Sequence, residues 1–247
     1  FAELVQNKSG ELFLSTRFLS LKKSDGTFVL ETNKDPIRAK HLINCGGLQS
    51  DRIAKKCGVE PKARIVPFRG EYYKIRSNKK HLVNNLIYPV PDPAFPFLGV
   101  HFTRMIDGER EAGPNAVLSF KREGYHKTSF SLKDSWSTFS YPGFIKLATK
   151  FMKMGLGEFY RSYNKRAFVK ALQKLIPEIQ MQDVVPGGAG VRAQALEKSG
   201  ALVDDFKIVE AENMVHVLNA PSPAATASIS IGEKIADMAL KNFHIKK

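Results

Sequence analysis

The sequence contains few residues of the kinds that cross-link small secreted domains or bind metal ions. Its 247 residues include only two cysteines, Cys45 and Cys57, and no histidine or cysteine cluster has the spacing of zinc ligands. We therefore expect no disulfide framework, no metal site and a reducing compartment. Long apolar runs are missing too, since none approaches the roughly 18 residues of a membrane-spanning helix. This favours a soluble globular protein.

The glycine fingerprint of dinucleotide-binding folds is also absent. The segment PGGAGVRA at 186–193 is rich in glycine, but it lacks the G-x-G-x-x-G spacing and does not open a helix after a strand. It is therefore not a phosphate-binding loop. A protein that holds a dinucleotide in such a loop needs residues that this chain does not contain.

Acidic residues are scarce relative to basic ones, with 24 Asp and Glu against 38 Lys and Arg and a net charge of +14. The densest basic segment, residues 144–179, mixes Lys and Arg with Phe, Leu and Met in a helical pattern. Two interpretations stay open for it, a solvated helix face or peripheral docking on an anionic membrane surface. Nucleic acid is not expected as a partner, because no binding motif or stacking platform accompanies the charge.

The periodicity predicts an α+β fold without internal repeats. Helices are expected over 48–58, over 133–179 with a break at 140–143, and over 227–243. Strands are expected over 11–23, 27–32, 39–47, 64–75, 85–90, 97–105, 116–122, 187–196, 202–210 and 213–219. The middle strands are separated by Pro, Gly, Asn and Asp, which indicates an antiparallel or mixed sheet.

Two strand ends have the composition of ligand-binding turns. The strand before Gly46 and Gly47 ends in two residues without side chains, which permits a flat ligand to approach the backbone; a simple turn is the alternative. The stretch HVLNAPSPAAT at 216–226 joins a strand to a helix, and Ser222 or Thr226 is expected to cap that helix. It is either a well-capped turn or a ligand seat, since a helix start offers unpaired N–H groups.

One histidine has the setting of a catalytic base. In the strand FLGVHFTRM, a period of two places His101 and Thr103 on the less apolar face, with Leu98, Val100 and Phe102 opposite. A hydrogen-bonded structural histidine is the alternative. Either way, a histidine and a hydroxyl are expected side by side.

Six segments together resemble the L-2-hydroxyglutarate dehydrogenases and oxidases, a branch of the D-amino-acid-oxidase-like flavoproteins. They occur in that family's order from the first fifth to the last tenth of the chain. The segments are INCGGLQSDRIA at 43–54, RIVPFRGEYY at 64–73, IYPVPDPAFPFLGVHFT at 87–103, GPNAVLSFKREGY at 113–125, GAGVRAQAL at 188–196 and HVLNAPSPAAT at 216–226.

The resemblance implies two domains and an FAD cofactor. Residues 1–62 and 184–247 are expected to be the remnant of an α/β FAD-binding domain, and residues 63–183 a substrate domain with a mixed or antiparallel sheet and a helical segment. Family members are longer at the N-terminus, where the glycine fingerprint lies. The chain is therefore expected to be a C-terminal portion of the enzyme, inactive alone.

The resemblance also implies roles for individual residues. The reaction oxidises a 2-hydroxy dicarboxylate to the 2-oxo acid, so it needs a base, for which His101 is the candidate, and groups that bind carboxylates. The expected substrate ligands are Arg192, Arg69, Tyr88, Thr103 and Asn115. The expected FAD contacts are Cys45, Gly46, Gly47, Asn219, Ala220, Pro221, Ser222, Ala224, Ala225 and Thr226.

The function expected from the resemblance is FAD-dependent oxidation of L-2-hydroxyglutarate to 2-oxoglutarate, with a quinone or oxygen as the electron acceptor. The protein would be cytoplasmic or peripheral on the inner membrane, and mitochondrial in a eukaryote. Two alternatives stay open: another FAD-dependent oxidase of the group, acting on an amino acid or glycerol 3-phosphate, and a non-catalytic basic domain that docks on membranes or partners through residues 144–179.

Overall fold

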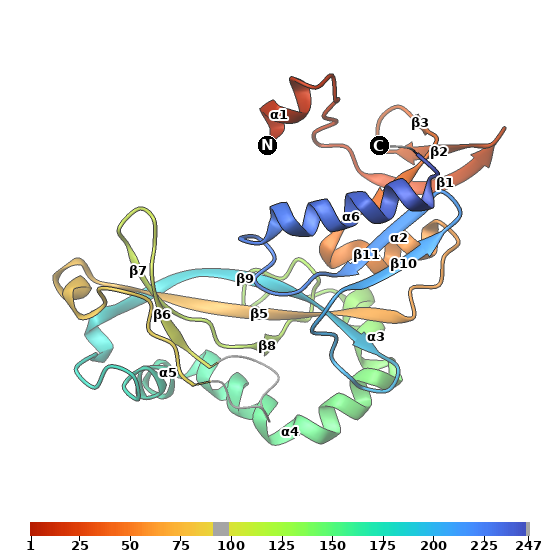
Figure 1. Ribbon diagram of the computed structural model, residues 1–247. Coiled ribbons are helices and arrows are strands. Elements are labelled where there is room, and N and C mark those ends of the chain that lie inside the picture. The colour runs from red at the N-terminus through yellow and green to blue at the C-terminus, as the bar shows by residue number, and fades with distance from the viewer. Residues whose placement is uncertain (91–98, 246–247) are drawn as a thin grey trace. The chain divides into compact units, whose positions relative to one another are not determined.

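The computed structural model describes residues 1–90 and 99–245, which form two compact units (Figure 1). Unit 1 consists of Phe1–Pro61 and Asp205–Lys247, and unit 2 of Lys62–Asp204. The second boundary lies later than the expected 183/184, because strand β9 (Val184–Glu197) pairs along its length with β5 (Ala63–Ile75) inside unit 2.

Unit 1 contains two three-stranded sheets. The first is an antiparallel meander of β1 (Phe18–Ser24), β2 (Thr27–Thr32) and β3 (Ile37–Ala39). Asp25 and Gly26 join β1 to β2 with φ values of 49° and 72°, the left-handed backbone that a two-residue hairpin turn requires. A short helix, α1 (Ala2–Gln6), precedes this sheet.

The second sheet of unit 1 has the order β10–β11–β4 and is mixed. Strand β11 runs antiparallel to β10 and parallel to β4, and its residues from Met214 to Leu218 are all buried. Val215 and Val217 pack against Ile235 and Ala239 of the last helix. The elements are β4 (Leu42–Asn44), η1 (Gly47–Gln49), α2 (Ser50–Lys56), β10 (Lys207–Ala211), β11 (Met214–Asn219) and α6 (Ser228–Asn242).

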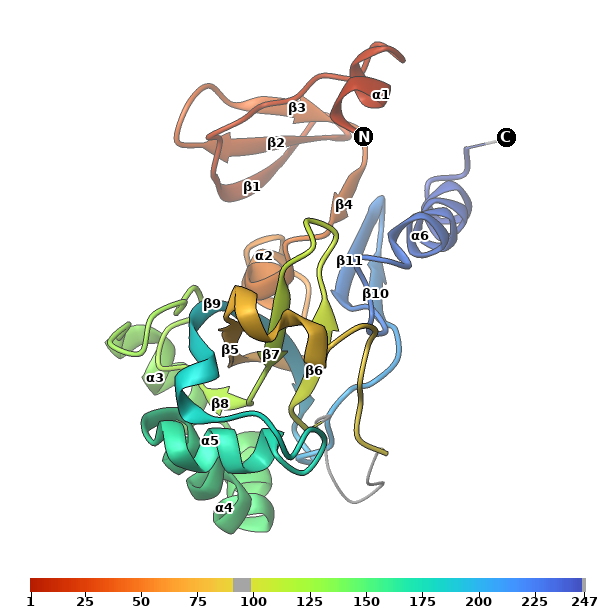
Figure 2. The ribbon, with the colours of Figure 1, turned by 90° about the vertical axis from the view of Figure 1, so that its left-hand side faces the viewer.

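Unit 2 is built on an antiparallel sheet of five strands in the order β6–β7–β5–β8, with β9 also paired to β5. The helices α3, α4 and α5 lie along one side of this sheet (Figures 1 and 2). The remaining elements are η2 (Ser77–Leu82), β6 (His101–Arg104), β7 (Arg110–Gly113), β8 (Val117–Leu118), α3 (Leu132–Phe139), α4 (Pro142–Tyr163), α5 (Lys165–Leu172) and η3 (Met181–Asp183).

The helical segment is divided where its sequence changes. Ser131 caps α3 by accepting from the Asp134 N–H at 3.3 Å, and α4 begins at Pro142, which confirms the expected break at 140–143. Helix α4 is kinked at Phe151, where φ is −117° and ψ is 21°. Helix α5 ends at Leu172 rather than near 179, since Pro177 prevents its continuation.

Several expected strands are shorter in the structure. A strand forms only where a neighbouring backbone accepts and donates its hydrogen bonds. Ile87 makes one isolated bridge to Phe102, and Leu202 one to Leu196. Residues 97 and 98 of the strand expected over 97–105 lie outside the described residues. The shortened strands are those expected over 11–23, 39–47, 85–90, 116–122 and 202–210.

Residues 1–90 and 99–245 lack two features. They contain no helix that is both long and apolar enough to cross a membrane. No three His, Cys, Asp or Glu side chains in this part of the chain are grouped so that they could hold a metal ion.

Candidate active site

On the more polar face of strand β6, the His101 ring stacks with the ring of Tyr88, which lies outside the strand. His101 and Thr103 are half-buried on that face, whereas Phe102 between them is fully buried in the apolar core. The Tyr88 ring stacks on the His101 ring, with centroids 4.2 Å apart and an interplanar angle of 18°. Three of the residues expected to bind substrate or act in catalysis therefore come from adjacent segments of unit 2.

The hydrogen bonding of His101 defines its tautomer. Its Nδ1 lies 3.2 Å from the Gly99 carbonyl oxygen. Because a carbonyl oxygen only accepts, Nδ1 carries the proton in this bond, and Nε2 keeps its lone pair. Burial lowers the pKa of His101 below its usual value, against a smaller opposing effect of the bond to Gly99. At neutral pH the ring is therefore neutral and Nε2 can accept a proton.

Tyr72 is a neighbour of this pair that the sequence analysis did not identify. His101 pairs across the sheet with Gly113, and a Cβ added to Gly113 would lie 3.3 Å from Cδ1 of Tyr72. The glycine thus leaves no side chain between Tyr72 and His101. Burial raises the pKa of the Tyr72 phenol, and the electrostatic effect of Glu111 and Tyr88 raises it further, so the phenol keeps its proton as a donor.

A second polar cluster in unit 2 is centred on the buried carboxylate of Glu71. Arg69, which is 3% exposed, donates to Glu71 Oε1 from Nε at 3.0 Å and from Nη2 at 2.9 Å. Its Nη1 donates to the His126 carbonyl oxygen at 3.1 Å. The guanidinium expected to bind substrate is therefore engaged by the protein's own groups.

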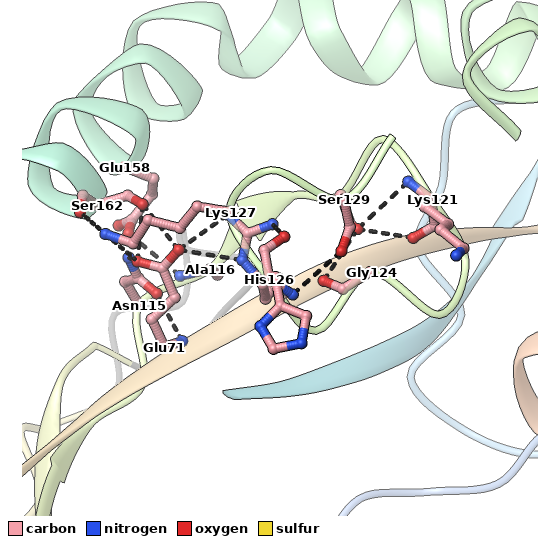
Figure 3. Close-up of polar contacts among 12 residues, drawn as sticks. Glu71, Asn115, Ala116, Lys121, Gly124, His126, Lys127, Ser129, Glu158 and Ser162 are labelled. Atoms are coloured by element: carbon pink, nitrogen blue, oxygen red, sulfur yellow. Dashed lines mark hydrogen bonds and ion pairs between the residues drawn. The ribbon is translucent and has the colours of Figure 1, made fainter. Parts of the chain in front are cut away.

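Three further side chains surround the same carboxylate (Figure 3). Asn115 accepts from the Glu71 N–H at 2.8 Å and donates to Oε2 at 3.1 Å. The Ser162 hydroxyl lies 2.8 Å and 2.7 Å from the two oxygens, and Lys127 Nζ is 3.4 Å from Oε2. Strand β5, the loop after β8 and the end of α4 thus meet at one ionised group.

These contacts determine the charge state of Glu71. Burial pushes the pKa of the carboxyl up, but hydrogen bonds from Ser162, Arg69 and Asn115 and the charge of Lys127 outweigh it, so the pKa lies below its usual value. Glu71, Lys127 and Ser162 were not among the residues predicted from the sequence. The adjacent RGE in the segment 64–73 was the available signal, since i and i+2 residues of a strand share a face.

The loop that carries Lys127 is held by bonds of its own (Figure 3). The Ser119 hydroxyl donates to the Lys121 carbonyl oxygen at 2.7 Å, and the His126 N–H donates to the Ser129 hydroxyl at 3.3 Å. Lys127 Nζ also donates to the Ser162 carbonyl oxygen. The ammonium therefore has a defined position although its side chain is 41% exposed.

Arg192 lies on β9, away from the Glu71 contacts. It is exposed and pairs in register with Phe68 of β5. Along β9 the alternate residues Pro186, Gly188 and Gly190 are exposed as well. Small residues therefore precede Arg192 along the same exposed face of β9.

In unit 1, the glycine pair follows β4 as expected. A Cβ on Gly46 would lie 2.4 Å from Cδ1 of Ile53, so a larger residue there would require the Ile53 side chain to move. Gly47 has φ of 50° and open space where a Cβ would be. The exposed Cys45 precedes them, and burial of its sulfur raises the pKa of the thiol. The turn therefore presents bare backbone.

His216 is a structural residue of the sheet beside this turn. It is fully buried and pairs in register with Asn44, whose Nδ2 lies 3.1 Å from His216 Nδ1. Asn44 also donates to the Ser50 carbonyl oxygen at 2.8 Å. These bonds join β4, β11 and the start of α2.

The junction before α6 differs from the expected capped turn. The N-cap residue is Ala227, with no side-chain cap hydrogen bond among the described residues, so the prediction that Ser222 or Thr226 caps the helix is wrong. The Thr226 hydroxyl instead donates to the Pro223 carbonyl oxygen at 3.2 Å, because the helix begins two residues later. Residues 222–226 are all exposed, and the first turn of α6 lies beside them.

Comparison with known proteins gives consistent matches along the whole chain. The family described as FAD dependent oxidoreductase matches residues 1–238. A protein of Indibacter alkaliphilus named L-2-hydroxyglutarate dehydrogenase is 52% identical over 244 residues, which are 98% of this chain and 61% of that protein. The mitochondrial L-2-hydroxyglutarate dehydrogenase of Nematostella vectensis is 49% identical over 220 residues, 87% of this chain and 48% of that protein.

The fold also matches that of solved flavoproteins. The structure of FAD-bound L-alpha-glycerophosphate oxidase from Mycoplasma pneumoniae superposes with a TM-score of 0.69 at 18% identity, covering 99% of this chain and 54% of that one. This similarity concerns the fold alone. The chain thus spans about half to three fifths of the length of the proteins that it matches.

Proposed function

The chain belongs to the FAD-dependent oxidoreductase family, and we propose on this premise that it is part of an enzyme that oxidises L-2-hydroxyglutarate to 2-oxoglutarate. The observation that carries the proposal is the 52% identity to a protein named for this activity, which extends through both units. The D-amino-acid-oxidase-like fold expected from the sequence agrees with the family match.

We assign the FAD contacts to unit 1, whose residues fit such a group. The backbone at Gly47 has open space beside it, and the exposed junction before α6 places the N–H groups of a helix start within reach of an anionic ring. FAD, when bound, supplies the acceptor for the substrate's hydride. The proposed contacts are Cys45, Gly46, Gly47, Asn219, Ala220, Pro221, Ser222, Ala224, Ala225 and Thr226.

The substrate groups are assigned to unit 2. His101 Nε2 accepts the proton of the substrate's hydroxyl while Tyr88 holds the imidazole by stacking, and Thr103 donates a hydrogen bond. Arg192 binds a carboxylate. Arg69 and Asn115 act indirectly, since both bind Glu71 and so position the segment between β7 and β8.

Product analysis tests the substrate class. We expect the holoenzyme, with an artificial electron acceptor, to convert L-2-hydroxyglutarate to 2-oxoglutarate faster than it oxidises glycerol 3-phosphate or an amino acid. Faster oxidation of either of the latter would assign the chain to another oxidase of the group. A purified holoprotein without flavin would instead favour the non-catalytic interaction domain.

The proposal includes the enzyme's electron acceptor and its location in the cell. A quinone or oxygen takes the electrons, and residues 144–179 contact a membrane surface peripherally. The segment carries the exposed apolar side chains Ile145, Met152 and Leu156 among its lysines. The protein would be cytoplasmic or lie on the inner membrane, and be mitochondrial in a eukaryote.

The exposed junction before α6 gives a prediction on cofactor retention. Ala224→Leu places a bulky side chain where the ring is expected, and Thr226→Pro alters the turn that Thr226 makes with Pro223. Each change is expected to weaken FAD retention about tenfold. Flavin absorbance per chain after gel filtration measures it, with Ala236→Leu, on the exposed side of α6, as the control. Unchanged flavin content in both variants would remove the junction from the FAD site.

A further inference from the structure

An apolar cavity of about 440 Å³ lies within unit 2, between α4 and the strands β5 and β8. Its walls include aromatic side chains from the sheet, from the segment after β8, from α3 and from α4. The cavity has one ionisable side chain in its lining, Glu158, which accepts from the Ala116 N–H at 3.2 Å and pairs with Arg161. Representative wall residues are Phe68, Leu118, Phe120, Phe139, Phe144 and Phe151.

This cavity does not suit the proposed dicarboxylate substrate. Burial of a carboxylate without a cation or fixed donors is costly, and Glu158 adds a like charge. Its volume is nevertheless within the range of small-molecule sites. The occupant that matches the lining is therefore a hydrocarbon chain.

Cations adjoin the cavity on the same helix. Lys150, Lys153 and Arg161 line a shallow hollow on α4 that shares Phe151 and Met154 with the cavity. Lys150 Nζ lies 5.1 Å from the centre of the Phe151 ring, at the kink of α4. A ligand whose chain fills the cavity would thus have its polar end beside two lysines.

Several side chains of α4 that line the cavity are also exposed to solvent. Ile145, Met152 and Leu156, which line the cavity, are 51%, 60% and 65% exposed. Exposed apolar side chains interspersed with lysines are typical of helices that lie in the interface of an anionic bilayer. A ligand drawn from such a surface would reach the cavity between these side chains.

We propose that the cavity beneath α4 binds an acyl chain of an anionic phospholipid, with Lys150 and Lys153 on its phosphate. The proposal rests on the peripheral membrane contact proposed for residues 144–179, and not on the oxidation reaction. Apolar burial supplies affinity, and the lysines supply selectivity for the anionic head group.

Titration of the holoenzyme with monomeric lysophosphatidylglycerol, by calorimetry, tests the proposal. We expect binding of one molecule per chain, weaker binding of lysophosphatidylcholine and none of inorganic phosphate, which has a charge but no chain. Equal affinity for the two lysolipids, tighter binding of a neutral short-chain quinone, or no binding of either lysolipid would overturn it.

Substitutions at Gly155 test whether the acyl chain lies in the cavity. Gly155 lines the cavity, and a Cβ there meets nothing within 4 Å, so a larger residue fits and also favours the helix. Gly155→Leu fills part of the cavity and is expected to weaken the binding of both lysolipids about tenfold. Gly155→Ala is expected to leave both affinities near those of the parent. Unchanged affinity in Gly155→Leu would show that the acyl chain binds outside this cavity.

Lysine substitutions locate the head group. The double change Lys150→Gln and Lys153→Gln is expected to remove the preference for lysophosphatidylglycerol, whereas Lys170→Gln on α5 preserves it. A retained preference in the double variant would contradict the proposed phosphate contact. Flavin reduction by L-2-hydroxyglutarate, measured on the same variants, should not change. Loss of lipid binding with normal flavin reduction bears on the lipid site alone. Normal lipid binding without flavin reduction bears on the proposed oxidation alone.

Discussion

Replacement of His101 by asparagine is expected to lower the rate of flavin reduction by L-2-hydroxyglutarate about 10²–10⁴-fold, the usual contribution of a positioned general base. Asparagine keeps a donor for the Gly99 carbonyl oxygen but has no lone pair of comparable basicity in place of Nε2. Anaerobic stopped-flow absorbance of the holoenzyme measures the rate. A rate close to that of the parent would exclude His101 as the base.

The pH dependence checks the same assignment. His101 acts as a base only when it is neutral, and burial holds its pKa below the usual value of about 6.5. The parent rate is therefore expected to be level near neutrality and to fall as the pH drops through that lowered pKa. His101→Asn should lose this acid limb, while His81→Asn, an exposed control, retains it. An identical acid limb in His101→Asn would assign the titration to another group.

Replacement of Glu71 by glutamine is expected to destabilise the protein by about 3–5 kcal/mol, because it leaves the guanidinium of Arg69 buried without its carboxylate. Urea denaturation of the holoenzyme measures the change. Glu31→Gln is the matched control, since its partner Lys22 has a side chain 70% exposed and such surface pairs contribute at most about 1 kcal/mol. Equal losses in the two variants would show that the Glu71 cluster does not stabilise the fold.

The unfolding free energy of the parent protein should also depend on pH, because Glu71 titrates. Its pKa is lowered on folding, so its contribution is present above the unfolded carboxyl pKa of about 4.3 and is lost as the pH falls through the lower folded value. In Glu71→Gln the unfolding free energy is therefore expected to fall less steeply over this range. A slope equal to that of the parent would contradict the lowered pKa.

Local periodicity was sufficient for features that depend on neighbours in the sequence. The polar face shared by His101 and Thr103, the turn at Asp25 and Gly26 and the helix break before Pro142 all follow from spacing or from backbone preference. The family resemblance was equally visible, because its segments are continuous.

Features that depend on tertiary contacts could not be predicted from local sequence patterns. Glu71 receives its bonds from Asn115, which is 44 positions away, and from Ser162, which is 91 positions away. No sequence period connects such groups, so the pairing of these side chains around Glu71 was not predicted. The cap of α6 was misplaced for a related reason, since the Thr226 hydroxyl can serve either a helix start or the preceding turn.

Tyr72 and Tyr73, which are adjacent on β5, also could not be assigned from the sequence pattern alone. Tyr73 packs against Phe168 in the core, with ring centroids 4.7 Å apart, and Tyr72 therefore faces the opposite side of β5. Alternation predicts that the two face opposite sides of the strand, but not which one packs against Phe168. Only the pairing of β6, β7 and β5 places Tyr72 near His101.

Anaerobic mixing of the oxidised holoenzyme with L-2-hydroxyglutarate is the most direct test of the proposed function. The flavin absorbance is expected to bleach in a single turnover, with one 2-oxoglutarate formed per flavin, and the D enantiomer should leave the spectrum unchanged. A spectrum that L-2-hydroxyglutarate does not change, in a protein that retains its flavin, would contradict the assignment.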